Sequence, residues 1–93
     1  MANNLFISYD LFVPGQGYDK VAAAIKSLGT WAKVQMSFWY VKSNYSANKA
    51  AEIVWAAMDA NDSLIIVDAT NSNAVWYNLK PEVSTFIQDH WRS

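Results

Sequence analysis

The sequence predicts one α+β domain in which two helices alternate with four strands. Residues 4–10 alternate between the two faces of an extended chain, as a strand does. Residues 18–28 and 46–60 carry apolar side chains at the spacing of one helix face. The chain has 93 residues, which is enough for a single domain and too few for two.

The first part of the chain is expected to form a strand, a loop and a helix. One face of the first strand carries Leu5, Ile7 and Tyr9. Residues 11–17 are expected to be a loop, because Pro-Gly and a second Gly break regular structure. The helix over residues 18–28 has Asp19 in its first turn, where the helix dipole favours an acid. Gly29 is expected to end this helix in the left-handed conformation.

The segment from Thr30 to Ser43 is rich in strand-forming residues but too long for one ordinary strand. We therefore expect two strands joined near residues 35–37, although this turn lacks the Gly, Asn or Asp that hairpins favour. A second helix is expected over residues 46–60, with Ser46 as its N-cap.

The last strand of the sheet, expected over residues 63–69, is apolar on both faces between residues 64 and 67. As a fourth strand it would lie at a sheet edge, and proteins usually cover apolar edges. Residues 75–79 have strand propensity and could pair with such an edge, in the same chain or in a partner. Pro81 then begins a short amphipathic helix that ends near residue 91.

Taken in order, these elements predict a ferredoxin-like β-α-β-β-α-β fold, an antiparallel sheet with helices on one face. A C-terminal strand and a short helix are added to it. We expect a single domain over residues 1–93, with the extension over residues 71–93 at a dimer interface.

The composition favours association with other protein surfaces over binding to nucleic acid. Hydrophobic residues make up 53% of the chain and aromatic residues 15%, whereas only 16% are charged and the net charge is −1. Phosphate binding needs clustered Lys and Arg, so we expect weak or no nucleic-acid binding. The chain has no Cys, which suits the cytoplasm. We expect neither a signal peptide nor a membrane span.

Several short motifs resemble one known protein family. Leu5–Asp10 and Lys33–Phe38 resemble the Tyr-Asp strand and the basic-Val-Gln-x-Ser-x-Phe stretch of the small CRISPR adaptation nuclease, the second CRISPR-associated protein. Other motifs are similar to its stand-alone SinR-like relatives and to the virulence-associated protein D group: Ser8–Leu11, Pro14–Gln16, Tyr18-Asp19, Gly29–Trp31, Asn61-Asp62 and Ile66–Asp68. The resemblance covers residues 4–70.

This resemblance implies a ferredoxin-like homodimer in which a C-terminal strand can pair across the dimer. It implies that Asp10 from each protomer approaches the dimer axis, where the two carboxylates can bind one Mg²⁺ or Mn²⁺. It also implies a mobile-element or phage-defence context.

The candidate site residues each have a second interpretation. Asp10 could bind a hard divalent cation that activates water for attack on a phosphodiester, or it could cap the loop that follows it. Asp62, expected at the same end of the sheet, could be a further metal ligand or a turn residue. Ser37 and Gln35 could orient water or phosphate near Asp10, or satisfy a turn or bulge. Asp68 is expected at the opposite end of the sheet.

The aromatic and histidine side chains are also open to two interpretations. Tyr9, Trp31, Trp39 and Trp76 could stack on bases, but without interleaved cations we favour packing in a core or interface. His90, the sole histidine, is expected to be partly buried packing on the last helix.

Two functions therefore remain. The first is a non-catalytic, dimeric interaction protein with a protein partner. The second is a Mg²⁺- or Mn²⁺-dependent ribonuclease or deoxyribonuclease that uses Asp10 from both protomers.

Overall fold

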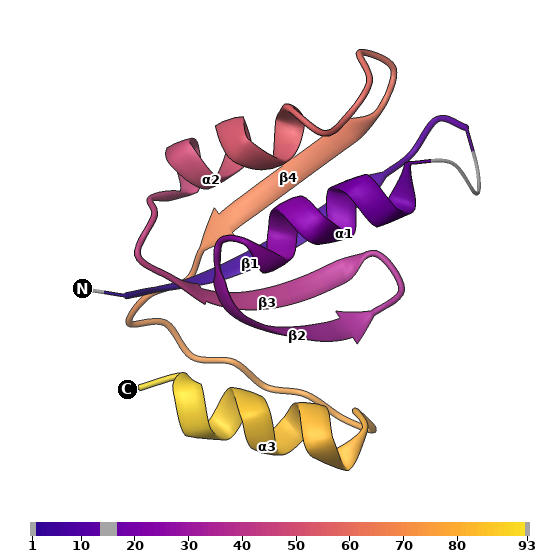
Figure 1. Ribbon diagram of the computed structural model, residues 1–93. Helices are drawn as coiled ribbons and strands as arrows, with labels where there is room; N and C mark the ends of the chain where they lie inside the picture. Colours follow the sequence, from indigo (N-terminus) through magenta and orange to yellow (C-terminus); the bar gives the residue numbers. More distant parts are fainter. Residues whose placement is uncertain (1, 14–16, 93) are drawn as a thin grey trace.

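The structure, a computed structural model, describes residues 2–13 and 17–92 and has an α+β fold (Figure 1). The elements follow in the order β1 (Asn3–Asp10), α1 (Tyr18–Lys26), β2 (Gly29–Gln35), β3 (Phe38–Ser43), α2 (Ala47–Trp55), β4 (Ser63–Asp68) and α3 (Pro81–His90). The loop expected at residues 11–17 lies partly outside the described residues. Within those ranges, no helix has the length and hydropathy needed to cross a membrane.

The four strands form one antiparallel sheet in the order β2-β3-β1-β4. The register places Ile7 of β1 opposite Trp39 of β3 on one side and Ile66 of β4 on the other. Because side chains alternate along a strand, these three residues face the same side of the sheet. β2 and β4 are the edge strands.

Helices α1 and α2 cover one face of the sheet together, as Figure 1 shows. Their buried stripes are short, Val21 and Ile25 in α1 and Ala50 and Val54 in α2. They pack on the inward residues of β1 and β3 to form the main core, which comprises Leu5, Ile7, Tyr9, Leu11, Val21, Ile25, Leu28, Trp39, Val41, Ala50 and Val54.

Helix α3 lies on the opposite face, so the expectation of helices on one face holds only for α1 and α2. Its buried residues Val83 and Ile87 form a second core with Ala32 and Tyr40 of the sheet. The cause is that β1 to β3 carry large apolar side chains on both faces, and burial of this second face requires a second layer.

The expected strand at residues 75–79 is absent, because the segment between β4 and α3 is irregular. Asn71 and Asn78 adopt left-handed φ values of 67° and 61°, which interrupt an extended chain. The indole N–H of Trp76 donates a hydrogen bond to the Ser84 hydroxyl at 3.0 Å. Side-chain docking onto α3 and the second core therefore replaces backbone pairing with an edge.

The division of residues 30–43 into two strands at residues 35–37 is confirmed. β2 and β3 are joined by a two-residue turn, Met36-Ser37, and neither residue has a positive φ. The register shifts by one residue between Lys33 and Gln35. Such a bulge increases the local twist, which allows a tight hairpin without the Asn-Gly that mirror-image turns require.

Gly29 begins β2, and the expectation that it ends α1 in the left-handed conformation is wrong. Gly17 is the only described glycine with a positive φ. A Cβ added to Gly29 would lie 2.1 Å from the backbone oxygen of Lys42. Glycine is therefore required by the close approach of β2 to β3 and not by a helix end.

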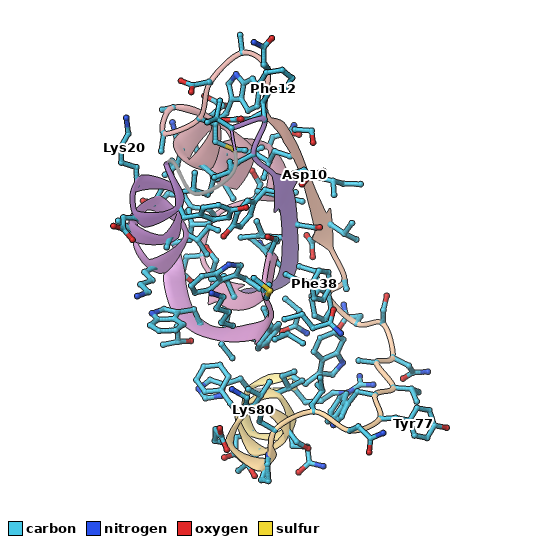
Figure 2. All side chains as sticks on the ribbon, turned by 90° about the vertical axis from the view of Figure 1, so that its right-hand side faces the viewer. Asp10, Phe12, Lys20, Phe38, Tyr77 and Lys80 are labelled. Atoms are coloured by element: carbon cyan, nitrogen blue, oxygen red, sulfur yellow. The ribbon has the colours of Figure 1, made fainter. Side chains whose placement is uncertain are left out.

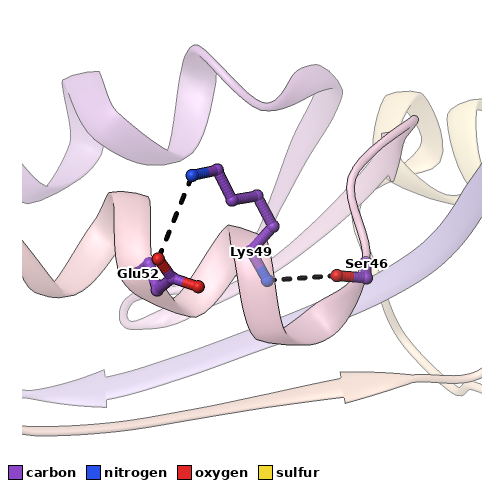
Figure 3. A network of polar contacts seen from close by, with 3 residues as sticks. All are labelled: Ser46, Lys49 and Glu52. Carbon is purple, nitrogen blue, oxygen red and sulfur yellow. Dashed lines mark hydrogen bonds and ion pairs between the residues drawn. The ribbon is translucent and has the colours of Figure 1, made fainter.

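Ser46 is the N-cap of α2, as predicted from the sequence. Its hydroxyl accepts a hydrogen bond from the Lys49 N–H at 3.1 Å, and Lys49 forms an exposed ion pair with Glu52 (Figure 3). The helix is shorter than expected. It ends at Trp55, and the N–H groups of Ala57 and Met58 then bond to oxygens only three residues earlier.

Candidate functional site

Asp10 is the last residue of β1, and its side chain is exposed. It lies opposite Ser63, the first residue of β4. A shallow hollow of about 260 Å³ at this position is also lined by Ser8, Tyr9, Leu64 and Ile65. Figure 2 shows Asp10 at the end of the sheet near Phe12, far from the C-terminal segment that carries Tyr77. The carboxylate can therefore be reached by an ion or a partner.

Asp62 lies at the same end of the sheet, as expected, but its carboxylate closes a turn. One oxygen accepts the N–H of Phe12 at 2.7 Å, and the other accepts the N–H of Asp59 at 2.8 Å. The two bonds fix the turn before β4 and tie it to the loop after β1. Both oxygens thus have backbone donors that a metal would have to compete with.

Ser37 and Gln35 occupy different surroundings. The backbone oxygen of Ser37 accepts the N–H of Tyr9 at 3.2 Å, which places this turn next to the end of β1. Gln35 pairs with Phe38, and Phe38 pairs with Ser8. Since neighbouring strands are about 4.8 Å apart, the backbone of Gln35 is roughly 10 Å from β1. Ser37 is adjacent to the Asp10 end of the sheet, whereas Gln35 belongs to a groove on the α3 side.

Asp68 lies opposite Leu5 at the other end of β4, as predicted. Its carboxylate accepts the N–H of Thr70 at 3.0 Å and so caps the turn after the strand. His90 stacks on the Phe86 ring with centroids 4.0 Å apart, and its Nδ1 lies 2.8 Å from the Phe86 oxygen. Its partly buried position on α3 agrees with the packing interpretation.

The tryptophans of β2 and β3 contact each other on the α1 and α2 side of the sheet. Trp39 is buried, whereas Trp31 is 38% exposed, and their ring centroids lie 5.3 Å apart. Lys26 lies 4.7 Å from the Trp31 ring and Lys33 lies 5.7 Å from the Trp39 ring. These two cations face the α1 and α2 side, away from Asp10, and do not form a phosphate-binding group with it.

The metal-binding capacity of one chain is small. No group of three or more His, Asp or Glu in residues 2–13 and 17–92 could hold a metal ion. Asp10 would contribute one carboxylate, and Mg²⁺ sites commonly use one or two carboxylates with waters and substrate phosphates. Metal-dependent chemistry at Asp10 would therefore need a second protomer or the substrate.

The apolar edge strand β4 is the second exposed feature of the fold. Ile65 and Val67 are 61% and 49% exposed. They point to the α3 side of the sheet, but the core beneath α3 is formed by residues of β1, β2 and β3. β4 thus combines an unpaired backbone edge with an apolar outer face, as the sequence predicted, and no part of the described chain pairs with that edge.

A buried polar residue that the sequence analysis missed, Asn4, holds the C-terminal part in place. Its side-chain N–H donates to the Trp91 oxygen at 2.8 Å, and its side-chain oxygen accepts from Tyr40 at 2.8 Å and from Lys42 at 3.0 Å. The sequence could have indicated this role. Asn4 shares a strand face with Phe6, and a polar residue on a buried face needs hydrogen-bond partners.

No protein-family model and no curated protein sequence matches this chain.

Proposed function

We propose that this chain is a non-catalytic interaction protein that forms a homodimer through β4. The observation that carries the proposal is the apolar, unpaired edge at residues 63–68 with Ile65 and Val67 exposed beside it. Open apolar edges associate readily. Only 16% of the residues are charged and the net charge is −1, so there is little electrostatic repulsion between two copies.

We further propose a ferredoxin-like fold, related to the CRISPR adaptation nuclease and SinR-like proteins. The β-α-β-β-α-β order of the first six elements supports this proposal. So does a sheet in which β1 lies between β3 and β4 with all neighbours antiparallel. The family resemblance of residues 4–70 is the basis for a mobile-element or phage-defence context, and the lack of Cys is the basis for a cytoplasmic location.

The dimer is expected to be symmetric, with β4 pairing antiparallel to its own copy about a two-fold axis at Ile65. In such an interface the same patch is used by both subunits. The result is one continuous eight-stranded sheet. Ile65 would then face Ile65 of the second copy across the axis, with Val67 on the same face of the strand beside it, and these exposed side chains would bury apolar area.

The same geometry separates the two Asp10 residues. Asp10 is opposite Ser63, at one end of β4. An antiparallel β4 pair puts the two Ser63 ends at opposite ends of the joint sheet, about 14 Å apart along the strands for four residues of rise. One metal ion cannot bridge carboxylates so far apart. A β4 dimer and a nuclease with paired Asp10 are therefore alternatives that need different two-fold axes.

The alternative function is a Mg²⁺- or Mn²⁺-dependent nuclease in which Asp10 from both protomers binds one ion. The exposed position of Asp10 at the end of β1 favours it. Against it are the two backbone bonds on Asp62 and the engagement of Lys26 and Lys33 with tryptophan rings on the other face.

A cleavage assay distinguishes the two functions. Purified protein is incubated with labelled RNA and DNA with Mg²⁺ or Mn²⁺, beside Asp10→Ala and a matched exposed control, Asp89→Ala. The interaction proposal predicts no metal-dependent cleavage by any of the three proteins. Cleavage that is lost in Asp10→Ala and kept in Asp89→Ala would overturn it.

A further inference from the structure

A second hollow lies on the α3 side, away from Asp10 and β4. Its volume is about 550 Å³. It is lined by Phe6, Val34, Gln35, Phe38, Asn73, Ala74, Val75, Trp76, Tyr77, Leu79 and Ile87. We call it the aromatic groove. We propose that the aromatic groove binds a neutral, planar aromatic molecule of one or two fused rings.

The floor of the groove already consists of parallel aromatic rings. Phe6 and Phe38 stack with centroids 5.3 Å apart and an angle of 11° between their planes. Offset stacking at this spacing is the preferred arrangement of aromatic pairs. Both rings are partly buried, but Phe6 also contacts the rings of Tyr40 and Trp91. Phe38 is therefore the member of the pair that can continue the stack with a bound ring.

The segment before α3 forms the wall of the groove opposite this floor, and hydrogen bonds to residues that do not line the groove hold it in place. The Trp76 indole is tied to α3 by its hydrogen bond to Ser84. The Asn73 side-chain oxygen accepts a hydrogen bond from Arg92 at 3.3 Å. Tyr77, 85% exposed, stands at the rim, and Figure 2 shows its ring projecting outward from the segment before α3. The groove is therefore formed without a ligand, as small-molecule sites usually are.

The lining selects the charge of the ligand. None of the residues that line the groove carries a charge, and a desolvated ion without a partner is strongly disfavoured. The amides of Gln35 and Asn73 supply hydrogen-bonding groups among otherwise mostly apolar side chains, the pattern typical of ligand sites. A volume of about 550 Å³ lies within the range of small-molecule sites, roughly 300–1,000 Å³.

This inference is independent of the proposed dimer, because no residue of β4 lines the groove. Indole serves as the neutral aromatic probe, with cyclohexanol as the non-aromatic probe and benzoate as the charged one. The readout is the NMR signal of the Trp76 indole N–H in the full chain, since a ring stacked nearby shifts it. The chain has five Trp, so the exposed Trp55 on α2 serves as an internal reference.

We expect indole to shift the Trp76 signal saturably and to leave the Trp55 signal unchanged. Phe38→Leu, which keeps an apolar floor but removes the stacking ring, should weaken binding about 3- to 10-fold. Tyr77→Ala at the exposed rim should weaken it without affecting folding. Trp55→Leu, the matched aromatic control, should leave it unchanged.

Three results would overturn the proposal. The first is the absence of a saturable Trp76 shift with indole in the folded protein. The second is binding of cyclohexanol or benzoate as tightly as indole, which would contradict the aromatic or the neutral selectivity. The third is unchanged indole binding in both Phe38→Leu and Tyr77→Ala.

Discussion

At the scale of single residues, a few buried polar atoms determine where the C-terminal helix docks. Asn4 is 1% exposed and bonds to Trp91 at the end of α3, to Tyr40 and to Lys42. The Lys42 ammonium also lies 3.4 Å from the Trp91 oxygen, where a cation is favoured by the C-terminal end of a helix dipole. Removing one side chain of this hydrogen-bonded group would leave buried polar atoms of the others without partners, which lowers the free energy of unfolding by about 1–3 kcal/mol.

Tyr40 should make stability depend on alkaline pH. Its hydroxyl is buried, and this desolvation raises the pKa of Tyr40 to about 12 from 10.0. The raised pKa favours the protonated, folded state, so its contribution is complete below pH 10 and is lost as pH rises towards 12. Tyr40→Phe should therefore reduce the fall in the free energy of unfolding between these pH values, measured by urea denaturation. An identical pH dependence in both proteins would contradict this.

Gly29→Ala should destabilise the fold by about 1–3 kcal/mol, the usual cost of forcing atoms into filled space. The added Cβ would meet backbone oxygen of Lys42 at 2.1 Å, and backbone cannot move as a side-chain tip can. Urea unfolding at neutral pH measures the change. Thr30→Ala, at the exposed neighbour in β2, is the control and should be nearly neutral. Equal stability of the two variants would show that β2 can shift freely.

At the scale of elements, hydrophobic periodicity predicted correctly those helices and strands that are determined by nearby residues in the sequence. The spacing of Val21 and Ile25 in α1, the Ser46 cap of α2 and the alternation in β1 all correspond to observed elements. The expected strand at residues 75–79 was wrong because strand propensity is weaker than the burial of Trp76 and Leu79 in the second core. That competition depends on the arrangement of the whole sheet, which local sequence does not contain.

Ser46→Ala should destabilise the protein by about 1 kcal/mol, because the Lys49 N–H loses its side-chain acceptor. Ser46→Asp keeps an acceptor at the same place and should restore stability close to that of the parent. Thermal unfolding of the three proteins followed by circular dichroism measures the difference. If Ser46→Asp were as unstable as Ser46→Ala, the cap would not be the cause.

At the scale of the whole molecule, the sequence predicted an open apolar edge but not which surfaces the tail would cover. The hydrophobic run Leu64–Val67 indicated the edge strand, and the structure places it at the end of the sheet. The tail covers the face of β1, β2 and β3 and leaves the edge of β4 free. Of the candidate site, the sequence predicted the common location of Asp10 and Asp62, but not that backbone N–H groups occupy both Asp62 oxygens.

The proposed two-fold dimer requires β4 to be both unpaired and apolar in the monomer. Ile65→Lys introduces a charge that would face its symmetry mate across the axis, where like charges are destabilising. Ile65 is 61% exposed, so the monomer should fold normally. Val75→Lys, at an exposed apolar position outside β4, is the matched control.

Sedimentation equilibrium of these three proteins tests the central claim most directly. We predict twice the mass of one chain for the parent and for Val75→Lys, and a shift towards the mass of a single chain for Ile65→Lys. A parent protein that keeps the mass of a single chain at the highest concentration reached would contradict the account. A stable dimer that Ile65→Lys leaves intact would place the interface on a surface other than β4.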